Sequence, residues 1–467
     1  MSQPSTPTTM WEESRRRLIP GAVVGSLIEW YDIAIYAQAA ALVFGDLFFP
    51  DFSSTAGRVA SFATFGVGYF ARPIGAAIFG HVGDKYGRRV SLVATLVLMG
   101  CATVLIGLLP TYGAIGIAAP ILLVVCRLLQ GTGVGAEYVG AVTMVAEFAP
   151  PKRRGFAASL PACGVFLGMG LAAAVSALVN LLPQHELETW GWRVPFLLSA
   201  IVVGVGLYVR MRVPESPVFT KLERAQAHSR VPAATLVRAM PKRLLLVMLA
   251  NGPLAFNIYA VQTFSIGYLK DRDVSGTVAL VAVLVGCGVG AVSIPLIGRL
   301  SDRVGRRPAY LGAAAFCGLT AFPFFALLNT GVPALIYLAF AFTLGIGCLG
   351  IFGAQAAHYA ELFETRFRFS GMALGREIPG AVLAGPAPVI AVGLTSLLDG
   401  SPWLVATAMV LVAALAFGAV LLLPETRGVP LTSLVEEPAG LDLPHSRTDD
   451  RMVLRPSVSP TGPASPR

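Results

Sequence analysis

The feature of this sequence that most constrains its fold is a short charged loop that occurs twice. Residues 80–89 read Gly-His-Val-Gly-Asp-Lys-Tyr-Gly-Arg-Arg, and residues 298–307 read Gly-Arg-Leu-Ser-Asp-Arg-Val-Gly-Arg-Arg. Each copy lies between two long apolar stretches, and the aspartates Asp84 and Asp302 are 218 positions apart. A repeat at about half the chain length indicates two copies of one structural unit.

Further matches support the same duplication. Glu147 precedes a cluster of basic residues, and Glu361 does so 214 positions later. The sequence Pro-Glu-Ser at residues 214–216 returns as Pro-Glu-Thr at residues 424–426, an offset of 210. Many membrane transporters are built from repeated halves that move around a central binding site, so the duplication favours this architecture.

The composition indicates a membrane protein with many spanning segments. Of the 467 residues, 55% are hydrophobic and only 13% are charged, which is not typical of a soluble globular protein. The net charge of +9 does not indicate a nucleic-acid partner, because lysine and arginine cluster in short segments between the apolar runs. This distribution is typical of the positive-inside rule.

Twelve apolar stretches are long enough to cross a bilayer as helices, since a span needs about 20 mostly apolar residues. The sequence therefore predicts an all-α polytopic membrane protein with twelve transmembrane helices in two six-helix bundles. The basic segments then fall on one side, which predicts that both termini are cytoplasmic. The predicted spans are residues 19–44, 58–80, 90–109, 117–147, 156–182, 194–212, 243–268, 274–298, 308–329, 333–358, 370–397 and 402–423.

The chain divides into five segments on this pattern. The first apolar run is too long for the hydrophobic region of a signal peptide, so we expect it to remain as the first helix of a multi-pass protein in a bacterial plasma membrane. The segments are a cytoplasmic tail (1–17), a first bundle (18–212), a cytoplasmic central loop (213–242), a second bundle (243–426) and a disordered cytoplasmic tail (427–467).

Five further motifs accompany the doubled loop: Glu29-Trp30-Tyr31-Asp32, Phe70-Ala-Arg72-Pro73-Ile-Gly75, Arg127-Leu-Leu-Gln130-Gly-Thr-Gly133-Val-Gly-Ala-Glu137, Glu147-Phe-Ala-Pro-Pro-Lys-Arg-Arg-Gly155 and Glu361-Leu-Phe-Glu-Thr-Arg366. With the doubled loop, they resemble the major facilitator superfamily and, within it, the metabolite:proton symporter family. The resemblance covers about residues 18–428. It implies proton-coupled uptake, by alternating access, of a small organic acid or of a zwitterion such as betaine or proline.

Charged residues inside the predicted spans are the candidates for chemistry, because a charge within a bilayer is costly and is usually functional. Glu29 and Asp32 are three residues apart and share one helix face. We assign proton coupling to these two carboxylates and to Glu137. The candidates, all away from the ends of their spans, are Glu29, Asp32, Arg72, Arg127, Glu137, Arg376 and Glu377.

Arg127 reaches a similar predicted depth to Asp32, so the two side chains can form a pair within the first bundle. Protonation of Asp32 would then free the guanidinium for a substrate carboxylate, which the fork of arginine donors binds well. The alternative is that Arg127 only clamps two helices together. Arg72 is a second candidate for substrate binding, as a partner of Glu137 or of Glu29.

Polar and aromatic residues on the first, seventh and tenth spans are candidates for further substrate contacts. The resemblance implies that these helices line a central cavity. A tyrosine at helical spacing also serves often as a packing residue, which is the alternative for each position. The candidates are Tyr31, Tyr36, Asn257, Tyr259, Gln262 and Gln355.

The repeated loops are candidates for a conformational latch. The resemblance implies that such charged clusters hold one state closed, in the first half through Asp84, Arg88 and Glu147, and in the second through Asp302, Arg306 and Glu361. The alternative, charges that only set the topology, explains the arginines but not the repeated acids.

Arg376 and Glu377 form a charged pair of neighbours where the resembled family usually has an uncharged stretch. Adjacent residues of a helix point about 100° apart, so each side chain needs a partner of its own. We favour a latch role for Arg376, through Asp84, because the predicted helix places it only about two turns from the inner end. The alternative is that Arg376 lies in the cavity and contributes to substrate selection.

No sequence motif indicates an enzyme, a resident cofactor or a metal site. The expected partners are a small-molecule substrate, protons and the lipid bilayer, with no nucleic acid, and we expect a monomer. Two alternative functions remain at this stage: a proton-coupled exporter of drugs or metabolites, and a membrane nutrient sensor that binds without transport.

Overall fold

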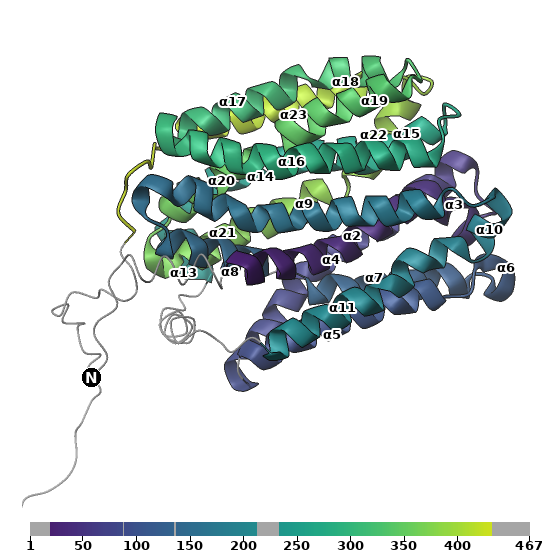
Figure 1. Ribbon diagram of the computed structural model, residues 1–467, viewed down its shortest axis with the longest axis horizontal. Coiled ribbons are helices and arrows are strands. Elements are labelled where there is room, and N and C mark those ends of the chain that lie inside the picture. The colour runs from purple at the N-terminus through teal and green to yellow at the C-terminus, as the bar shows by residue number, and fades with distance from the viewer. Residues whose placement is uncertain (1–18, 87, 135–136, 213–232, 432–467) are drawn as a thin grey trace, which may run out of the picture.

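The computed structural model describes residues 19–86, 88–134, 137–212 and 233–431, and every regular element in these ranges is a helix. The long helices run side by side as a bundle (Figure 1). Each of the twelve predicted spans coincides with one helix or with a run of consecutive helices. The structure therefore confirms the all-α fold.

The first six spans form the first half of the bundle. Short helices α3 (Phe44–Phe48), α6 (Tyr112–Ile115) and α10 (Gln184–Thr189) lie in the connections between them. The spans are α2 (Ile19–Leu42), α4 (Ser54–Tyr86), α5 (Arg88–Leu108), α7 with α8 (Ala118–Gly133 and Glu137–Phe148), α9 (Arg154–Val179) and α11 (Val194–Arg212).

The second half begins after the short helix α13 (Ala233–Ala239). Three of its spans contain a π-helical segment: η4 (Ala260–Phe264), η5 (Ala341–Cys348) and η6 (Gly380–Ala384). The spans are α14–η4–α15 (Pro241–Lys270), α16 (Gly276–Val304), α17 with α18 (Arg306–Leu319 and Ala321–Leu328), α19–η5–α20 (Pro333–Leu362), α21–η6–α22 (Thr365–Pro379, η6 and Ala387–Ser396) and α23 (Trp403–Leu422).

Nine of the spans, counted over the described residues, are long and apolar enough to cross a membrane. The other three are α2, α4 and α5. Charged side chains interrupt two of these helices, at Glu29 and Asp32 in α2 and at Arg72 in α4. Within α5, the segment Val93–Leu108 is a shorter apolar helix.

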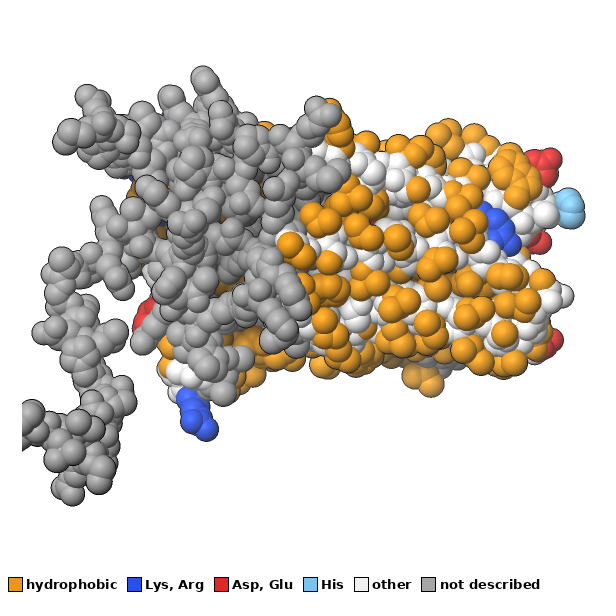
Figure 2. Space-filling model, turned by 90° about the horizontal axis from the view of Figure 1, so that it is seen from below, with side chains coloured by type: hydrophobic (Ala, Val, Ile, Leu, Met, Phe, Trp, Pro, Cys, Tyr) orange, Lys and Arg blue, Asp and Glu red, His pale blue; other side chains and the backbone are white. Residues whose placement is uncertain are grey.

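The side of the bundle seen from below is covered by hydrophobic side chains over much of its length (Figure 2). On α5, α7 and α11 these side chains point outward, where a soluble protein would place polar groups. In a bilayer this surface contacts lipid tails, so the exposed apolar band is what a spanning bundle requires. Its large exposed residues include Leu105, Leu108, Ile121, Leu122, Val125, Ile201 and Val205.

The two halves contact each other along several helix pairs. The α9 helix of the first half packs along α16 and α20 of the second half, and α4 packs against η6 and α22. Figure 1 shows α9 and α16 as neighbours at the border between the halves. Below, we call the end of the bundle where α9, α17 and α21 begin the basic end, and the other the opposite end.

Candidate functional site

A small cavity of about 50 Å³ lies between the two halves. The first half contributes side chains from α2, α4 and α9, and the second half contributes side chains from α14, α20, α21 and η6. A second cavity of about 20 Å³ adjoins it, and the two share Asn251 and Arg376. The larger cavity is lined by Trp30, Tyr69, Arg72, Val165, Phe166, Met169, Asn251, Ala255, Ile258, Tyr259, Phe352, Arg376, Glu377, Gly380 and Ala384.

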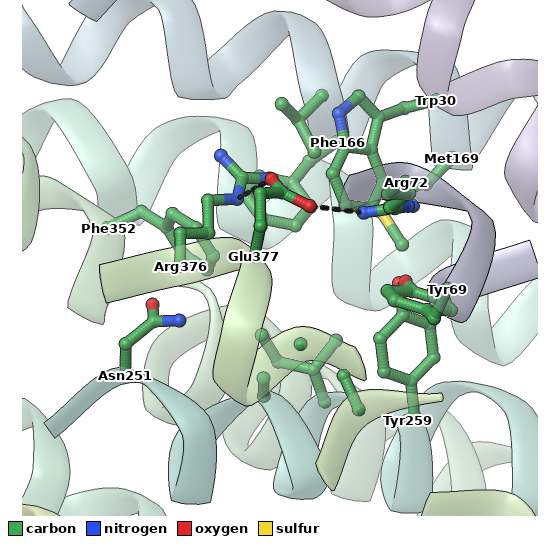
Figure 3. A pocket seen from close by; sticks show the side chains of 15 residues that line it. Trp30, Tyr69, Arg72, Phe166, Met169, Asn251, Tyr259, Phe352, Arg376 and Glu377 are labelled. Carbon is green, nitrogen blue, oxygen red and sulfur yellow. Dashed lines mark hydrogen bonds and ion pairs between the residues drawn. The ribbon is translucent and has the colours of Figure 1, made fainter. Parts of the chain in front are cut away.

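Glu377 lies between two arginines of this cavity, one from each half of the chain. Its Oε2 is 3.6 Å from Nη1 of Arg72 on α4, and its Oε1 is 3.9 Å from Nε of Arg376 on α21. Figure 3 shows the carboxylate between the two guanidinium groups. The side chains of Arg72, Glu377 and Arg376 are only 6%, 13% and 18% exposed, so these charges interact in a largely dry space.

Aromatic rings hold both arginines in place. The Arg72 guanidinium lies 3.9 Å from the ring centre of Tyr69, and that of Arg376 lies 4.0 Å from the ring centre of Tyr138. Trp30 lies within 6 Å of both guanidinium groups. Such cation–π contacts stabilise a cation most where water is excluded. The hydroxyl of Tyr69 also forms a hydrogen bond with that of Tyr259, which joins the two halves.

The position of Arg376 differs from the one expected from the sequence. The predicted helix began at residue 370, but α21 begins at Thr365, so Arg376 lies about 16 Å along the helix from its start. At this depth the side chain lines both cavities and packs on Tyr138. This place in the cavity wall favours the alternative role over the latch role, which stays a prediction because the side chain of its expected partner Asp84 lies outside the described part of the structure.

Asp32 lies inside the first bundle and does not line the cavity. Its Oδ2 accepts a hydrogen bond of 3.1 Å from Thr103 on α5, and its Oδ1 accepts one from Ser199 on α11. The carboxylate is fully buried, and it forms no ion pair with any residue in the described ranges. Two hydroxyl donors thus replace the cation that a buried carboxylate usually has.

Arg127 approaches Asp32 only through other side chains. It donates to Oε1 of Gln130, whose Nε2 donates to Thr103 Oγ1 over 2.7 Å, and this threonine hydroxyl reaches Asp32. The guanidinium also stacks on Tyr36, 4.2 Å from the ring centre. The predicted direct pair is therefore replaced by a relay of hydrogen bonds, and Arg127 does not line the cavity.

Two of the predicted substrate contacts do lie at the cavities. Tyr259 lines the larger one, and Gln355 lines the smaller one. The Gln355 amide donates to Oδ1 of Asn251 over 2.9 Å and lies 3.4 Å from the hydroxyl of Tyr310. Both side chains are therefore placed where they could contact a bound substrate, and their role in binding stays a prediction.

The other four predicted contacts are buried elsewhere. The Tyr31 hydroxyl donates to a backbone carbonyl of α11, and the Tyr36 hydroxyl donates to a threonine of α4. The Asn257 amide donates to a backbone carbonyl of α23. Gln262 is buried in η4 and does not line either cavity. Their places in the structure match the packing alternative.

Glu29 is buried on α2 and interacts electrostatically with Arg72. The side chains of three further predicted site residues, Asp84, Arg88 and Glu137, lie outside the described part of the structure. Their assigned roles in proton coupling and in the latch remain predictions.

Ion pairs join the two halves at the basic end. Arg154 at the start of α9 donates to Oε1 of Glu361 over 2.9 Å, and Arg368 on α21 pairs with Glu147 on α8. All four side chains are at most 4% exposed. These pairs cross between halves in opposite directions, so together they hold this end of the bundle closed. We call them the basic-end gate.

Asp302 adds a helix cap to this gate. Its carboxylate accepts hydrogen bonds of 2.8 and 3.0 Å from the backbone N–H groups of Gly155 and Phe156, the first turn of α9 in the other half. It also pairs with Arg306 at 2.7 Å, and Arg306 reaches Glu361 at 3.0 Å. A carboxylate at a helix N-terminus satisfies unpaired N–H groups and interacts favourably with the helix dipole.

Two glycines allow the close approach of α9 and α16 at this gate. A Cβ atom at Gly155 would lie 2.5 Å from the backbone oxygen of Gly298, and one at Gly298 would lie 2.8 Å from the backbone oxygen of Gly155. Real Cβ atoms do not approach a backbone oxygen this closely. The closed gate therefore depends on the absence of side chains at both positions.

The opposite end is also closed by charged contacts between the halves. Arg58 at the start of α4 pairs with Asp271 and donates to the carbonyl of Gly267 over 3.1 Å. Lys270 pairs with Asp46 at 3.0 Å. These side chains are 15–56% exposed, so their ion pairs are weaker than the buried ones of the basic-end gate. With both ends closed, the cavity is occluded.

Sequence reasoning missed several residues of the site. Tyr69 lies three residues before Arg72 on the same helix face, and that spacing could have identified it. Asn251 is one of three amide side chains in the predicted span 243–268, which is an available signal, whereas Tyr138 comes directly after a motif that ends at Glu137. The pair Arg58–Asp271 could have been found only from the structure, because the first turns of α4 and the turn after α15 are far apart in the sequence.

Comparisons with known proteins agree with this geometry. Residues 25–376 match the Major Facilitator Superfamily. The chain belongs to the major facilitator superfamily. It is therefore a multi-pass membrane transport protein and not an enzyme, as the sequence resemblance indicated.

Several relatives of this facilitator are metabolite transporters of Escherichia coli (strain K12). The chain is 39% identical to the inner membrane metabolite transport protein YhjE, over 89% of this chain and 95% of the relative. It is 34% identical to a shikimate transporter, over 83% of this chain and 89% of the relative. It is also 34% identical to a proline/betaine transporter, over 81% of this chain and 77% of the relative.

Solved structures confirm the fold. A crystal structure of a D-xylose-proton symporter superposes with a TM-score of 0.69, covers 88% of this chain and 99% of that protein, and is 20% identical. An inward-open structure of the xylose transporter XylE from E. coli gives a TM-score of 0.65 at 20% identity, over 90% and 98% of the two chains.

Proposed function

We propose that this protein is a proton-coupled symporter that imports a small organic acid or a zwitterionic metabolite by alternating access. The observation that carries the proposal is the occluded cavity between the halves, with Arg72 and Arg376 from different halves around Glu377. Paired guanidinium groups in a dry space bind a carboxylate well. Aromatic and apolar side chains complete the walls, as in most small-molecule sites.

Asp32 is the proposed proton site. A buried carboxylate without a cation is costly in its charged form, and protonation removes that charge. The hydrogen-bond relay through Thr103 and Gln130 connects it to Arg127, which stacks beside the aromatic wall of the first half. A change of charge at Asp32 can therefore alter the packing of the first half through this relay, although Asp32 does not contact the substrate.

The two closed ends support alternating access. In the proposed orientation the basic end faces the cytoplasm, in accordance with the positive-inside rule. Opening of the basic-end gate would release substrate into the cell, and opening of the pairs Arg58–Asp271 and Lys270–Asp46 would admit it from outside. The occluded state described here then lies between these two states.

Proteoliposomes with an acidic exterior provide the test. Wild-type protein should accumulate at least one of shikimate, proline and glycine betaine, and an internal pH dye should report proton entry with it. Asp32→Asn should lose accumulation and retain exchange of labelled for unlabelled substrate. The matched control is Asp399→Asn, which removes an exposed carboxylate at a residue with φ of 49°, a conformation that asparagine tolerates.

Each alternative function has a distinct outcome in this assay. Efflux of substrate against proton entry would indicate an exporter. Substrate binding without flux would indicate a sensor. Full accumulation by Asp32→Asn would remove Asp32 from the proton pathway.

A further inference from the structure

Glu377 is the only carboxylate among the described residues that line the larger cavity, and it has an arginine on each side. We propose that Glu377 occupies the place of the substrate carboxylate in the empty transporter, and that a proton and a substrate carboxylate replace it together. The inference deepens the proposed function and rests on it, because it assigns a substrate class and a second coupling proton to the same cavity.

The contacts of Glu377 are long for charged partners. Its distances of 3.6 Å to Arg72 and 3.9 Å to Arg376 exceed the roughly 2.7–2.9 Å that is usual for a charge-assisted hydrogen bond. Nη1 of Arg376 is buried, and no described residue accepts a hydrogen bond from it. The site thus has unused donor capacity. A ligand carboxylate that approaches to hydrogen-bond distance would be held more tightly than Glu377 is.

The surroundings of Glu377 come from five helices. From α4, Tyr69 and Arg72 face it, and from α21 Arg376 does so. Further titratable side chains interact with the two arginines. Glu29 of α2 and Tyr259 of α14 interact with Arg72, and Tyr138 of α8 packs on Arg376.

The charge balance of this group couples the proton to the substrate. If Glu377 alone took up a proton, Arg376 would lose its carboxylate partner and Arg72 would keep only its interaction with Glu29. If a substrate carboxylate alone entered, two carboxylates would compete for the same arginines. When both arrive, the protonated acid is neutral and the substrate carboxylate supplies the negative charge beside the two arginines, so a monoanion such as shikimate leaves the net charge of the cavity unchanged. Uptake of both together is therefore favoured over uptake of either alone.

The position of the arginines links this exchange to conformational change. Arg72 belongs to the first half and Arg376 to the second. A substrate carboxylate that binds both joins the two halves directly, as Glu377 does loosely in the empty state. Bound substrate therefore stabilises the occluded state, from which either end can open.

The walls of the cavity limit the substrate further. Trp30, Tyr69, Tyr259, Phe166 and Phe352 present aromatic surface, and Asn251 supplies one amide. This lining suits a small monocarboxylate with an apolar or planar body and a hydroxyl or amide group. A tricarboxylate would place charges against aromatic side chains without donors.

The pH dependence of binding to purified protein tests the inference. Shikimate, proline and glycine betaine serve as carboxylate probes, and shikimate methyl ester serves as the uncharged control. Where one proton enters with each ligand, wild-type affinity should fall as the pH rises, by up to about tenfold per pH unit. Glu377→Gln imitates the protonated acid, so its affinity should stay constant with pH and its proton-to-substrate ratio should fall by one.

Two further variants separate this inference from the proposed function. Glu377→Asp keeps the acid and should keep the pH dependence of binding. Asp32→Asn should lose accumulation but keep that pH dependence, because Asp32 lies outside the cavity. A wild type without proton-driven uptake overturns both proposals. Proton-driven uptake in the wild type, together with unchanged pH dependence in Glu377→Gln, overturns only the exchange at Glu377.

The methyl ester gives a result that does not depend on whether Glu377→Gln folds. Wild-type protein should bind shikimate at least tenfold more tightly than the ester if the acid is its ligand. Equal binding of acid and ester, or failure of all three carboxylates to bind, would show that the arginines do not receive a substrate carboxylate.

Discussion

Arg154 and Arg368 make the same two contacts from opposite halves of the chain. Each donates its Nε to the backbone carbonyl eight residues earlier, Ala146 for Arg154 and Ala360 for Arg368, at 3.1 and 2.8 Å. Each also pairs through Nη1 with a glutamate of the other half. The two arginines are 214 positions apart, which is the offset between their glutamates. Each copy of the duplicated sequence thus contributes one arginine and one glutamate to the basic-end gate.

Exchange of charges across this gate is the first prediction. Arg368→Glu places two carboxylates together, and the loss of a buried ion pair is worth about 3–5 kcal/mol. We expect the closed basic end to be disfavoured, so that a cysteine introduced in the cavity is labelled faster from the cytoplasmic side. The double variant with Glu147→Arg should return labelling toward the wild-type rate. If the double variant is labelled as fast as Arg368→Glu alone, Arg368 and Glu147 do not pair directly.

The pair Arg58–Asp271 provides a matched comparison at the other end. In Arg58→Gln, a cysteine introduced in the cavity should be labelled faster from outside the cell, and not from the cytoplasmic side. The effect should be smaller, about 1 kcal/mol or less, since these side chains are partly exposed.

The sequence predicted the elements of the gate but not its pairing. Repeated acids at Glu147 and Glu361 beside basic residues follow directly from the duplication. Which half each arginine contacts depends on how the two bundles pack, and helix periodicity contains no information on that. The sequence also placed Arg376 too close to the inner end of its helix, because hydropathy predicted a later helix start. Arg366 and Arg368 resemble loop residues in hydropathy, yet they lie in the first turn of α21 and shift its start toward the basic end.

Helix depth likewise predicted only part of the Asp32 site. The similar depth of Asp32 and Arg127 is consistent with the structure, because a relay of two side chains connects them. Which side chains lie between Asp32 and Arg127 depends on how each helix is rotated about its axis. Helix packing sets that rotation. Thr103 and Ser199 are isolated hydroxyls in apolar runs, so their role was not visible without the structure.

A side chain at Gly298 should prevent the basic end from closing. Gly298→Ala places a methyl group 2.8 Å from the carbonyl oxygen of Gly155, and relief requires α9 and α16 to separate. We expect the protein to remain open at the basic end, with slow transport and rapid cytoplasmic labelling of a cavity cysteine. Gly288→Ala on the same helix is the control, because nothing lies within 4 Å of its added Cβ. Normal transport by Gly298→Ala would mean that the gate closes with more space than the structure shows.

Glu425 should make stability depend on pH through its cap on α17. Its burial raises the pKa of the carboxyl, but hydrogen bonds from the backbone N–H groups of Arg306, Arg427 and Arg307 outweigh burial, so the pKa lies below its ordinary value. A lowered pKa means that the ionised group stabilises the fold above the unfolded-state pKa, and that this contribution disappears as the pH falls through the folded-state pKa.

Glu425→Gln should therefore have a lower Tm than the wild type at pH 7, by the equivalent of about 0.3–1 kcal/mol for a charge at a helix N-terminus. The difference should decrease on acidification toward the lowered pKa. Thermal unfolding of both proteins in detergent across this pH range provides the measurement. A difference in Tm that is constant with pH would assign the effect to shape or hydrogen bonding rather than to charge.

Arg376→Gln distinguishes a role in substrate binding from the latch role expected from sequence. Arg376 lines both cavities and packs on Tyr138, and it is a member of neither ion pair of the basic-end gate. Loss of a hydrogen bond to a charged ligand is worth about 1.5–3 kcal/mol, which is roughly a 10- to 150-fold weaker Kd for a carboxylate probe. Arg376→Lys keeps the charge but loses the fork of donors, so its Kd should lie between the two. Cytoplasmic labelling of a cavity cysteine should remain as in the wild type when no substrate is present. An unchanged Kd together with faster labelling would instead return Arg376 to the gate and leave Arg72 as the principal substrate arginine.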